Sequence, residues 1–149
     1  MAGSLFILAD EQIPLVDKVF SKFGNIKLVN GRTIDKKKIK NADVLLVRSV
    51  TNIDESLLKN TKIKFIGSAT SGIDHVDINY LNKSNISFSY TPGSNANSVA
   101  EYVLNSLITI ARNTNPPFSL SDKKVGIIGY GHVGSRVKYF MDIFNIKCF

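Results

Sequence analysis

Short apolar runs alternate with helix-like segments along the chain, and this alternation is the feature that most limits its possible folds. The runs are continuous rather than apolar at every second residue, a pattern that indicates strands covered on both faces. Such strands with helices between them build a parallel sheet in an α/β fold. Strands are predicted over 4–9, 26–29, 43–49, 63–69 and 86–90. We therefore expect a flavodoxin-like, doubly wound parallel sheet, whose ligands gather at the carboxyl ends of its strands.

Helices are predicted between these strands, over 14–23, 35–41, 54–60 and 77–84. The first helix has Pro14 at its start and Gly24 just past its end, positions that these two residues favour. Its apolar face is expected to comprise Leu15, Val19, Phe20 and Phe23. Thr51 and Asp54 are candidate caps of the third helix, and Asp77 is the expected cap of the fourth.

A long helix is predicted over 98–113, with Ser98 and Glu101 spaced as a capping box at its start. Its broad apolar surface is expected to be buried between domains or between subunits. That surface comprises Val99, Ala100, Val103, Leu104, Leu107, Ile108, Ile110 and Ala111. Two prolines in 113–122 end the helix, so we expect one domain over 1–97 and the linking helix with a second, incomplete domain over 98–149.

A glycine motif follows the strand predicted over 124–128. Gly129, Gly131 and Gly134 form Gly-x-Gly-x-x-Gly at the start of a helix predicted from about His132. In a dinucleotide-binding loop the first glycine makes a sharp turn, the second lets the backbone approach a pyrophosphate, and the third lets the helix pack closely on the strand. The helix then directs free N–H groups and its positive end at the anion.

This spacing predicts a dinucleotide-binding loop in which Gly129, Gly131, His132, Val133 and Gly134 contact the cofactor; a glycine-rich turn without a ligand is the alternative. The second half of the fingerprint is an acidic residue about 20 positions further on. That position falls at the end of the chain, after a strand predicted over 146–149. We therefore expect this sequence to be the front part of a longer protein.

Four segments resemble the NAD-dependent D-2-hydroxyacid dehydrogenases, in order and with the spacing of that family: "DVLLVRSVTNIDESLL", "FIGSATSGIDHVD", "TPGSNANSVAEYV" and "VGIIGYGHVG". The resemblance implies a parallel-sheet substrate domain followed by the start of a Rossmann NAD-binding domain. It implies oxidation of a small phosphorylated hydroxyacid, 4-phospho-D-erythronate, with hydride passing to NAD. It also implies a homodimer in the full-length form.

Ser49 and Thr70 are the substrate-contacting residues that the resemblance implies. Both follow the carboxyl ends of predicted parallel strands, and hydroxyls near backbone N–H groups suit a carboxylate or a phosphate. The alternative is that Ser49 only begins a turn and that Thr70 lies in an ordinary loop. Spacing alone favours neither interpretation, and the resemblance favours contact.

Three other polar residues have ordinary structural explanations. Arg48 binds an anion or pairs with a carboxylate such as Asp43 or Asp74. His75 is flanked by acidic residues, which suggests a general base, but local packing or hydrogen bonding is the stronger interpretation. His132 is expected to lie at the edge of the cofactor and need not titrate.

No catalytic residue is assigned in this chain. The resemblance implies an arginine, a glutamate and a histidine for catalysis, all at positions after 149. The chain is then expected to be inactive alone. The alternative is a non-catalytic remnant, or a fragment that only associates, of a phosphoglycerate-dehydrogenase-like protein.

Composition excludes several other classes of function. The net charge of +7 is dispersed apart from Lys36–Lys38, and no aromatic residue interleaves that run, so nucleic-acid binding is not expected. The single cysteine, Cys148, excludes an internal disulfide and a cysteine-based metal site. No segment is apolar for long enough to span a bilayer, and no basic leader precedes the first strand, so we expect no membrane partner and a cytoplasmic location.

Overall fold

The computed structural model describes residues 4–149, which divide into two compact units. The first unit ends at Thr91 and the second runs from Pro92 to Phe149. The division falls a few residues before the expected boundary, so the long helix α5 (Ala96–Asn113) belongs entirely to the second unit.

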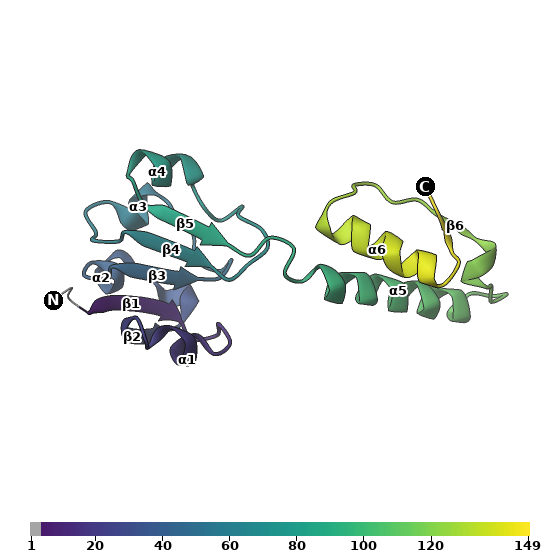
Figure 1. Cartoon of the computed structure of the whole chain (residues 1–149), viewed down its shortest axis with the longest axis horizontal. Coiled ribbons are helices and arrows are strands. Elements are labelled where there is room, and N and C mark those ends of the chain that lie inside the picture. The colour runs from purple at the N-terminus through teal and green to yellow at the C-terminus, as the bar shows by residue number, and fades with distance from the viewer. Residues whose placement is uncertain (1–3) are drawn as a thin grey trace. The chain divides into compact units, whose positions relative to one another are not determined.

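The first unit contains a five-stranded sheet in the order β2-β1-β3-β4-β5, and every neighbouring pair is parallel. Its strands are β1 (Leu5–Asp10), β2 (Gly24–Val29), β3 (Val44–Val47), β4 (Phe65–Ser68) and β5 (Ser87–Tyr90). Figure 1 shows β1, β3, β4 and β5 side by side with their arrows pointing the same way. This order is that of flavodoxin-like sheets and confirms the predicted fold.

Short helices connect the strands, and an aspartate side chain caps each of them except the first. They are α1 (Val16–Phe20), α2 (Lys36–Ile39), α3 (Glu55–Leu58) and α4 (Ile78–Lys83), with a 3-10 turn at Gly31–Thr33. The carboxylates of Asp35, Asp54 and Asp77 accept backbone N–H groups in the first turns of α2, α3 and α4. Thr51 does not cap α3, because its buried hydroxyl donates to the Gly31 carbonyl.

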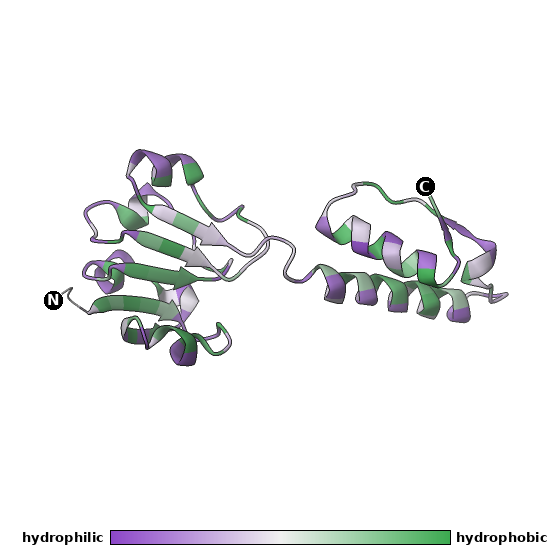
Figure 2. Cartoon of the chain, in the orientation of Figure 1, coloured by the Kyte–Doolittle hydropathy of each residue, from purple (hydrophilic) through white to green (hydrophobic). Residues whose placement is uncertain are grey.

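The two faces of this sheet are covered unequally. Helices α2, α3 and α4 pack on one face, where the core is built from Leu8, Ile39, Leu45, Val47, Leu58, Ile66 and Leu81. On the other face, Val16 of α1 packs on Ile7, Ala9 and Leu46. A cavity of about 270 Å³, lined mostly by apolar groups, adjoins that second cluster over β4 and β5. Figure 2 colours β1 and β3 as hydrophobic along most of their length. The expectation that helices cover both faces is therefore met fully on one face and partly on the other.

The apolar face predicted for the first helix is correct at Phe20, which packs against the Val16 cluster, and wrong at its other three residues. Leu15 adopts a left-handed conformation with φ 57°, so the helix begins only after it, and the inward residue is Val16 at 3% exposure. Leu15, Val19 and Phe23 are instead 66%, 45% and 54% exposed. Gly24 is also not a helix cap, because it begins β2 beside Leu5, where a Cβ atom would overlap the Leu5 carbonyl oxygen.

The second unit packs α5 against α6 (His132–Ile143). Between them a 3-10 turn at Leu120–Asp122 leads into β6 (Lys124–Val125), and β7 (Lys147–Cys148) pairs with β6 in parallel. The Ile127 N–H donates to the Phe149 carbonyl at 3.0 Å, which extends this pairing and confirms the strand predicted over 146–149.

The start of α5 differs from the prediction. The helix begins at Ala96 rather than Ser98, after a turn in which the Ala96 N–H donates to the Gly93 carbonyl at 3.0 Å. Gly93 makes this turn with φ +71°. Ser98 and Glu101 therefore lie inside the helix and do not form the predicted capping box.

Burial of the apolar surface of α5 is uneven. Ala100 is fully buried, and Val103, Leu104 and Leu107 pack in the cluster formed with Val137 and Met141 of α6. Ile110, in contrast, is 56% exposed in the described chain. The prediction that this surface is buried therefore holds on the side that faces α6.

Candidate functional site

The glycine loop between β6 and α6 has the backbone that a diphosphate needs. Gly129 takes φ +95°, a conformation that side chains rarely adopt, and so makes the sharp turn. A Cβ at Gly131 would meet no heavy atom within 4 Å, which leaves the backbone of this residue open to an approaching ligand. A Cβ at Gly134 would overlap the Gly129 carbonyl oxygen, so only glycine lets the helix pack this closely on the turn. Each glycine thus meets the requirement predicted for its position.

The first turn of α6 begins at this loop. Gly131 is the N-cap residue, and the Ser135 N–H donates to its carbonyl at 3.0 Å as the helix starts. The Val133 side chain packs in the α5–α6 core, so it is the backbone N–H of Val133 that is available to a ligand. Free N–H groups at the start of a helix attract an anion.

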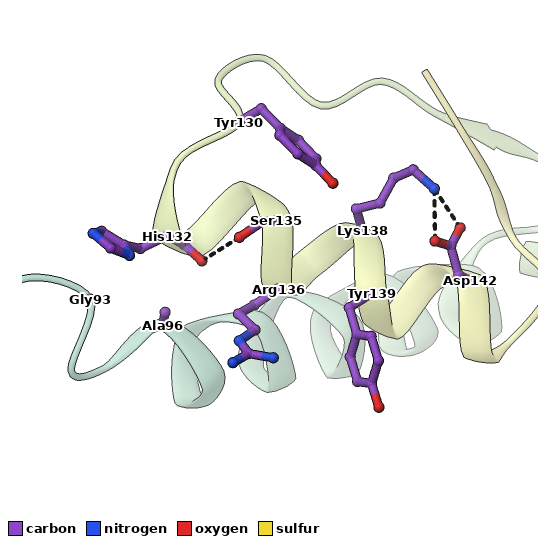
Figure 3. Close-up of a pocket in the computed structure, with 9 residues that line it drawn as sticks. All are labelled: Gly93, Ala96, Tyr130, His132, Ser135, Arg136, Lys138, Tyr139 and Asp142. Atoms are coloured by element: carbon purple, nitrogen blue, oxygen red, sulfur yellow. Dashed lines mark hydrogen bonds and ion pairs between the residues drawn. The ribbon is translucent and has the colours of Figure 1, made fainter.

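A cavity of about 480 Å³ adjoins the loop within the second unit. His132, Ser135 and Arg136 contribute to its lining. Figure 3 shows Arg136 and Tyr139 extending toward α5, whereas Tyr130 lies on the other side of α6. The His132 ring packs on Gly93, where a Cβ atom would come within 2.7 Å of its Cγ atom. Lys138 is paired with Asp142 at 2.7 Å. Basic side chains beside an open backbone suit a phosphorylated ligand.

Ser49 and Thr70 lie at the carboxyl edge of the first unit's sheet. They follow β3 and β4, which are neighbours with Val47 opposite Ser68, and the Ala69 N–H donates to the Val47 carbonyl at 2.9 Å. Ser49 is exposed in the turn after β3. The structure therefore brings both residues to one edge, where ligands of parallel sheets bind.

Thr70 belongs to a hydrogen-bonded group that sequence analysis missed. Its hydroxyl donates to the Gly72 carbonyl at 2.9 Å and lies 2.7 Å from the Ser68 hydroxyl, which lies 3.0 Å from Nε2 of His75. Burial lowers the pKa of His75 below its ordinary value of 6.5, and the charge of Asp74 opposes this shift. His75 is therefore neutral near pH 7, consistent with the local bonding expected for it.

Arg48 pairs with a carboxylate that the sequence did not suggest. Its Nε donates to Oδ2 of the fully buried Asp10 at 2.8 Å, and its Nη2 donates to Gln12 at 2.9 Å. Asp43, an expected partner, instead accepts the Phe6 N–H at 2.9 Å. Asp10 is the last residue of β1, and Arg48 directly follows the adjacent parallel strand β3, so their pairing ties together the carboxyl ends of two strands at the edge on which Ser49 lies.

Residues 4–149 contain neither a metal-binding cluster nor a membrane-spanning helix. That part of the chain contains no group of three or more His, Cys, Asp or Glu side chains placed to hold a metal ion. None of its helices has the length and apolar character needed to cross a membrane. Burial raises the pKa of the Cys148 thiol, which makes it a poor nucleophile.

Comparison with known proteins identifies the family. Residues 5–142 match the model of the D-isomer specific 2-hydroxyacid dehydrogenase catalytic domain. The chain belongs to this family. The solved NAD+-bound 3-phosphoglycerate dehydrogenase of Entamoeba histolytica shares the fold, with a TM-score of 0.82 and 30% identity over 98% of this chain and 53% of its own. A D-lactate dehydrogenase of Aquifex aeolicus, solved with NAD and lactic acid, has a TM-score of 0.78 at 23% identity, over 96% of this chain and 50% of its own.

Several family members named erythronate-4-phosphate dehydrogenase are similar in sequence. That of Hahella chejuensis is 46% identical over 95% of this chain and 36% of its own length. That of Chromohalobacter salexigens is 43% identical over 95% of this chain and 37% of its own length. The chain thus spans little more than a third of the length of these dehydrogenases.

Proposed function

We propose that this chain provides the substrate-binding edge and the diphosphate-binding loop of an NAD-dependent dehydrogenase that oxidises 4-phospho-D-erythronate. The product is 2-oxo-3-hydroxy-4-phosphonooxybutanoate, and the reaction belongs to pyridoxal phosphate biosynthesis. The names of the similar dehydrogenases support this substrate. In the full-length form we expect a cytoplasmic homodimer.

The observation that carries the proposal is the glycine loop. Gly129 turns the chain with a positive φ, Gly131 is open, and Gly134 allows close packing. In the proposed complex the N–H groups of His132 and Val133 and the open backbone at Gly131 hold the diphosphate of NAD. When bound, NAD+ supplies the hydride acceptor.

The proposed role of the first unit is to bind the substrate. Ser49 and Thr70 are the proposed contact residues, since both lie at the carboxyl edge of adjacent strands. In this account residues 1–97 belong to the substrate-side domain, and residues 98–149 to the linking helix and the NAD-binding domain. The family pattern implies a catalytic arginine, glutamate and histidine, and no residue of this chain is assigned to those roles. We therefore expect the 149-residue chain to bind the substrate and NAD without catalysing the reaction.

Substrate binding tests this proposal in the first unit. Titration of the 15N-labelled chain with 4-phospho-D-erythronate is expected to shift the amide resonances of residues next to Ser49 and Thr70. The variant Ser49→Ala is expected to weaken this binding up to about tenfold, as for loss of one hydrogen bond. Ser21→Ala is the matched control, because Ser21 is an exposed serine after α1, and it is expected to bind as the unaltered chain does.

Two outcomes would contradict the proposal. The first is a titration in which no resonance at the carboxyl edge moves. The second is NADH formation by the 149-residue chain, which would show that the catalytic residues lie within it.

A further inference from the structure

The group formed by Thr70, Ser68 and His75 is a continuous chain of hydrogen bonds. Thr70 Oγ1 lies 2.9 Å from the Gly72 carbonyl oxygen and 2.7 Å from Ser68 Oγ. Ser68 Oγ in turn lies 3.0 Å from His75 Nε2. The chain begins at a ring nitrogen and ends at a carbonyl.

The carbonyl fixes the direction of every bond in this chain. A carbonyl oxygen only accepts, so the single proton of the Thr70 hydroxyl is donated to Gly72. Thr70 must then accept from Ser68, whose single proton is used in that bond. Ser68 must accept from His75, so the neutral imidazole carries its proton on Nε2.

Regular backbone pairing holds the three residues that contribute side chains to this series of hydrogen bonds. Ser68 is the last residue of β4 and is only 3% exposed. The His75 carbonyl accepts the Ile53 N–H at 2.8 Å, beside a bridge between Ile53 and Val76. The Thr70 carbonyl accepts both the backbone N–H and the hydroxyl of Thr91, at 3.2 and 3.1 Å. The Thr70 hydroxyl is therefore fixed from its side chain and from its backbone.

We propose that His75 is a positioning residue: through Ser68 it orients the Thr70 hydroxyl so that Thr70 meets the substrate as a hydrogen-bond acceptor. This inference rests on the proposed function. With its proton committed to Gly72, Thr70 has only a lone pair to offer a ligand. A carboxylate or a phosphate dianion has no proton to donate, so the matching substrate group is a hydroxyl. 4-Phospho-D-erythronate carries hydroxyls on its second and third carbons.

The tautomer of His75 tests the direction of these hydrogen bonds without any ligand. The protein has two histidines, so His132→Gln identifies the His75 ring signals in a 15N spectrum of chain free of any histidine tag. Near pH 7.5 we expect the proton on Nε2, and in Ser68→Ala we expect a mixture of the two tautomers. A proton on Nδ1 in the unaltered chain would overturn the proposal.

Ligand binding tests the positioning role. We expect His75→Leu to weaken binding of 4-phospho-D-erythronate about three- to tenfold, and His75→Gln, which keeps an N–H donor, to restore most of that loss. Thr70→Val, which keeps the shape and removes the acceptor, is expected to weaken binding about tenfold. Equal affinities for the leucine and glutamine variants would overturn the positioning role. If the tautomer is as expected but no resonance shifts with 4-phospho-D-erythronate, the proposed function fails while the hydrogen-bond chain stands.

Discussion

Replacing Gly134 with alanine is expected to destabilise the second unit by about 2–3 kcal/mol, near the upper end of the cost of overpacking. The new Cβ would overlap the Gly129 carbonyl oxygen and lie 3.1 Å from its carbon and 3.4 Å from Cγ2 of Ile127. The nearest of these atoms are backbone and cannot turn aside as a flexible side chain would. Gly129 already has φ +95°, so the turn has little freedom to yield. Either α6 must move away from the turn or the turn must change shape.

Urea unfolding followed by amide resonances measures this effect, because signals from α6 report on the second unit separately from the sheet of the first. Gly131→Ala is the matched control, since its Cβ would meet nothing within 4 Å and its φ is −90°. Because Gly131 is the N-cap of α6, we expect the control to lower the free energy of unfolding by no more than about 1 kcal/mol, the usual cost of alanine at an N-cap. Equal stability of the two variants would contradict the close packing of α6 on the turn.

Replacing Asp10 with alanine is expected to destabilise the first unit by about 2–3 kcal/mol. The change leaves the Arg48 guanidinium and the Gln12 N–H without the carboxylate that accepts from both. Removing one partner of a fully buried ion pair costs about 3–5 kcal/mol. Arg48 is 29% exposed, so water compensates part of that loss and we expect a smaller value.

The same urea experiment, read from amides of β1 and β3, measures the effect of Asp10→Ala. Glu11→Ala is the control, because Glu11 is the exposed acidic neighbour of Asp10, and its effect should stay within about 0.5 kcal/mol. Asp10→Asn keeps an acceptor without the charge and should lie between the two. A loss for Asp10→Ala no greater than for Glu11→Ala would show that the ion pair does not stabilise the sheet.

Local sequence patterns predicted the parts of this fold that depend on local chemistry. Continuous apolar runs gave the five strands and their parallel order, and aspartates at 35, 54 and 77 cap the helices that follow them. The glycine spacing predicted the loop between β6 and α6, because each of its three positions has a separate steric requirement that only glycine meets well.

Features set by distant parts of the chain could not be predicted in this way. Arg48 and Asp10 lie 38 residues apart and meet only because β1 and β3 are neighbours in the sheet. The pairing of Ser68 with His75 likewise requires the loop after β4 to return to that strand. The inward face of α1 was predicted correctly only at Phe20, because the left-handed backbone of Leu15 delays the start of the helix and apolar periodicity does not reveal that conformation.

The most direct measurement of the central claim is the affinity of NAD+ for the unaltered chain and for Gly131→Ala, by calorimetric titration. If the loop holds a diphosphate, the unaltered chain binds NAD+, and the added methyl group weakens binding by about tenfold or more while the second unit stays folded. ADP should compete for the same site. Equal NAD+ affinities for the two proteins, or no binding by the unaltered chain, would contradict the account.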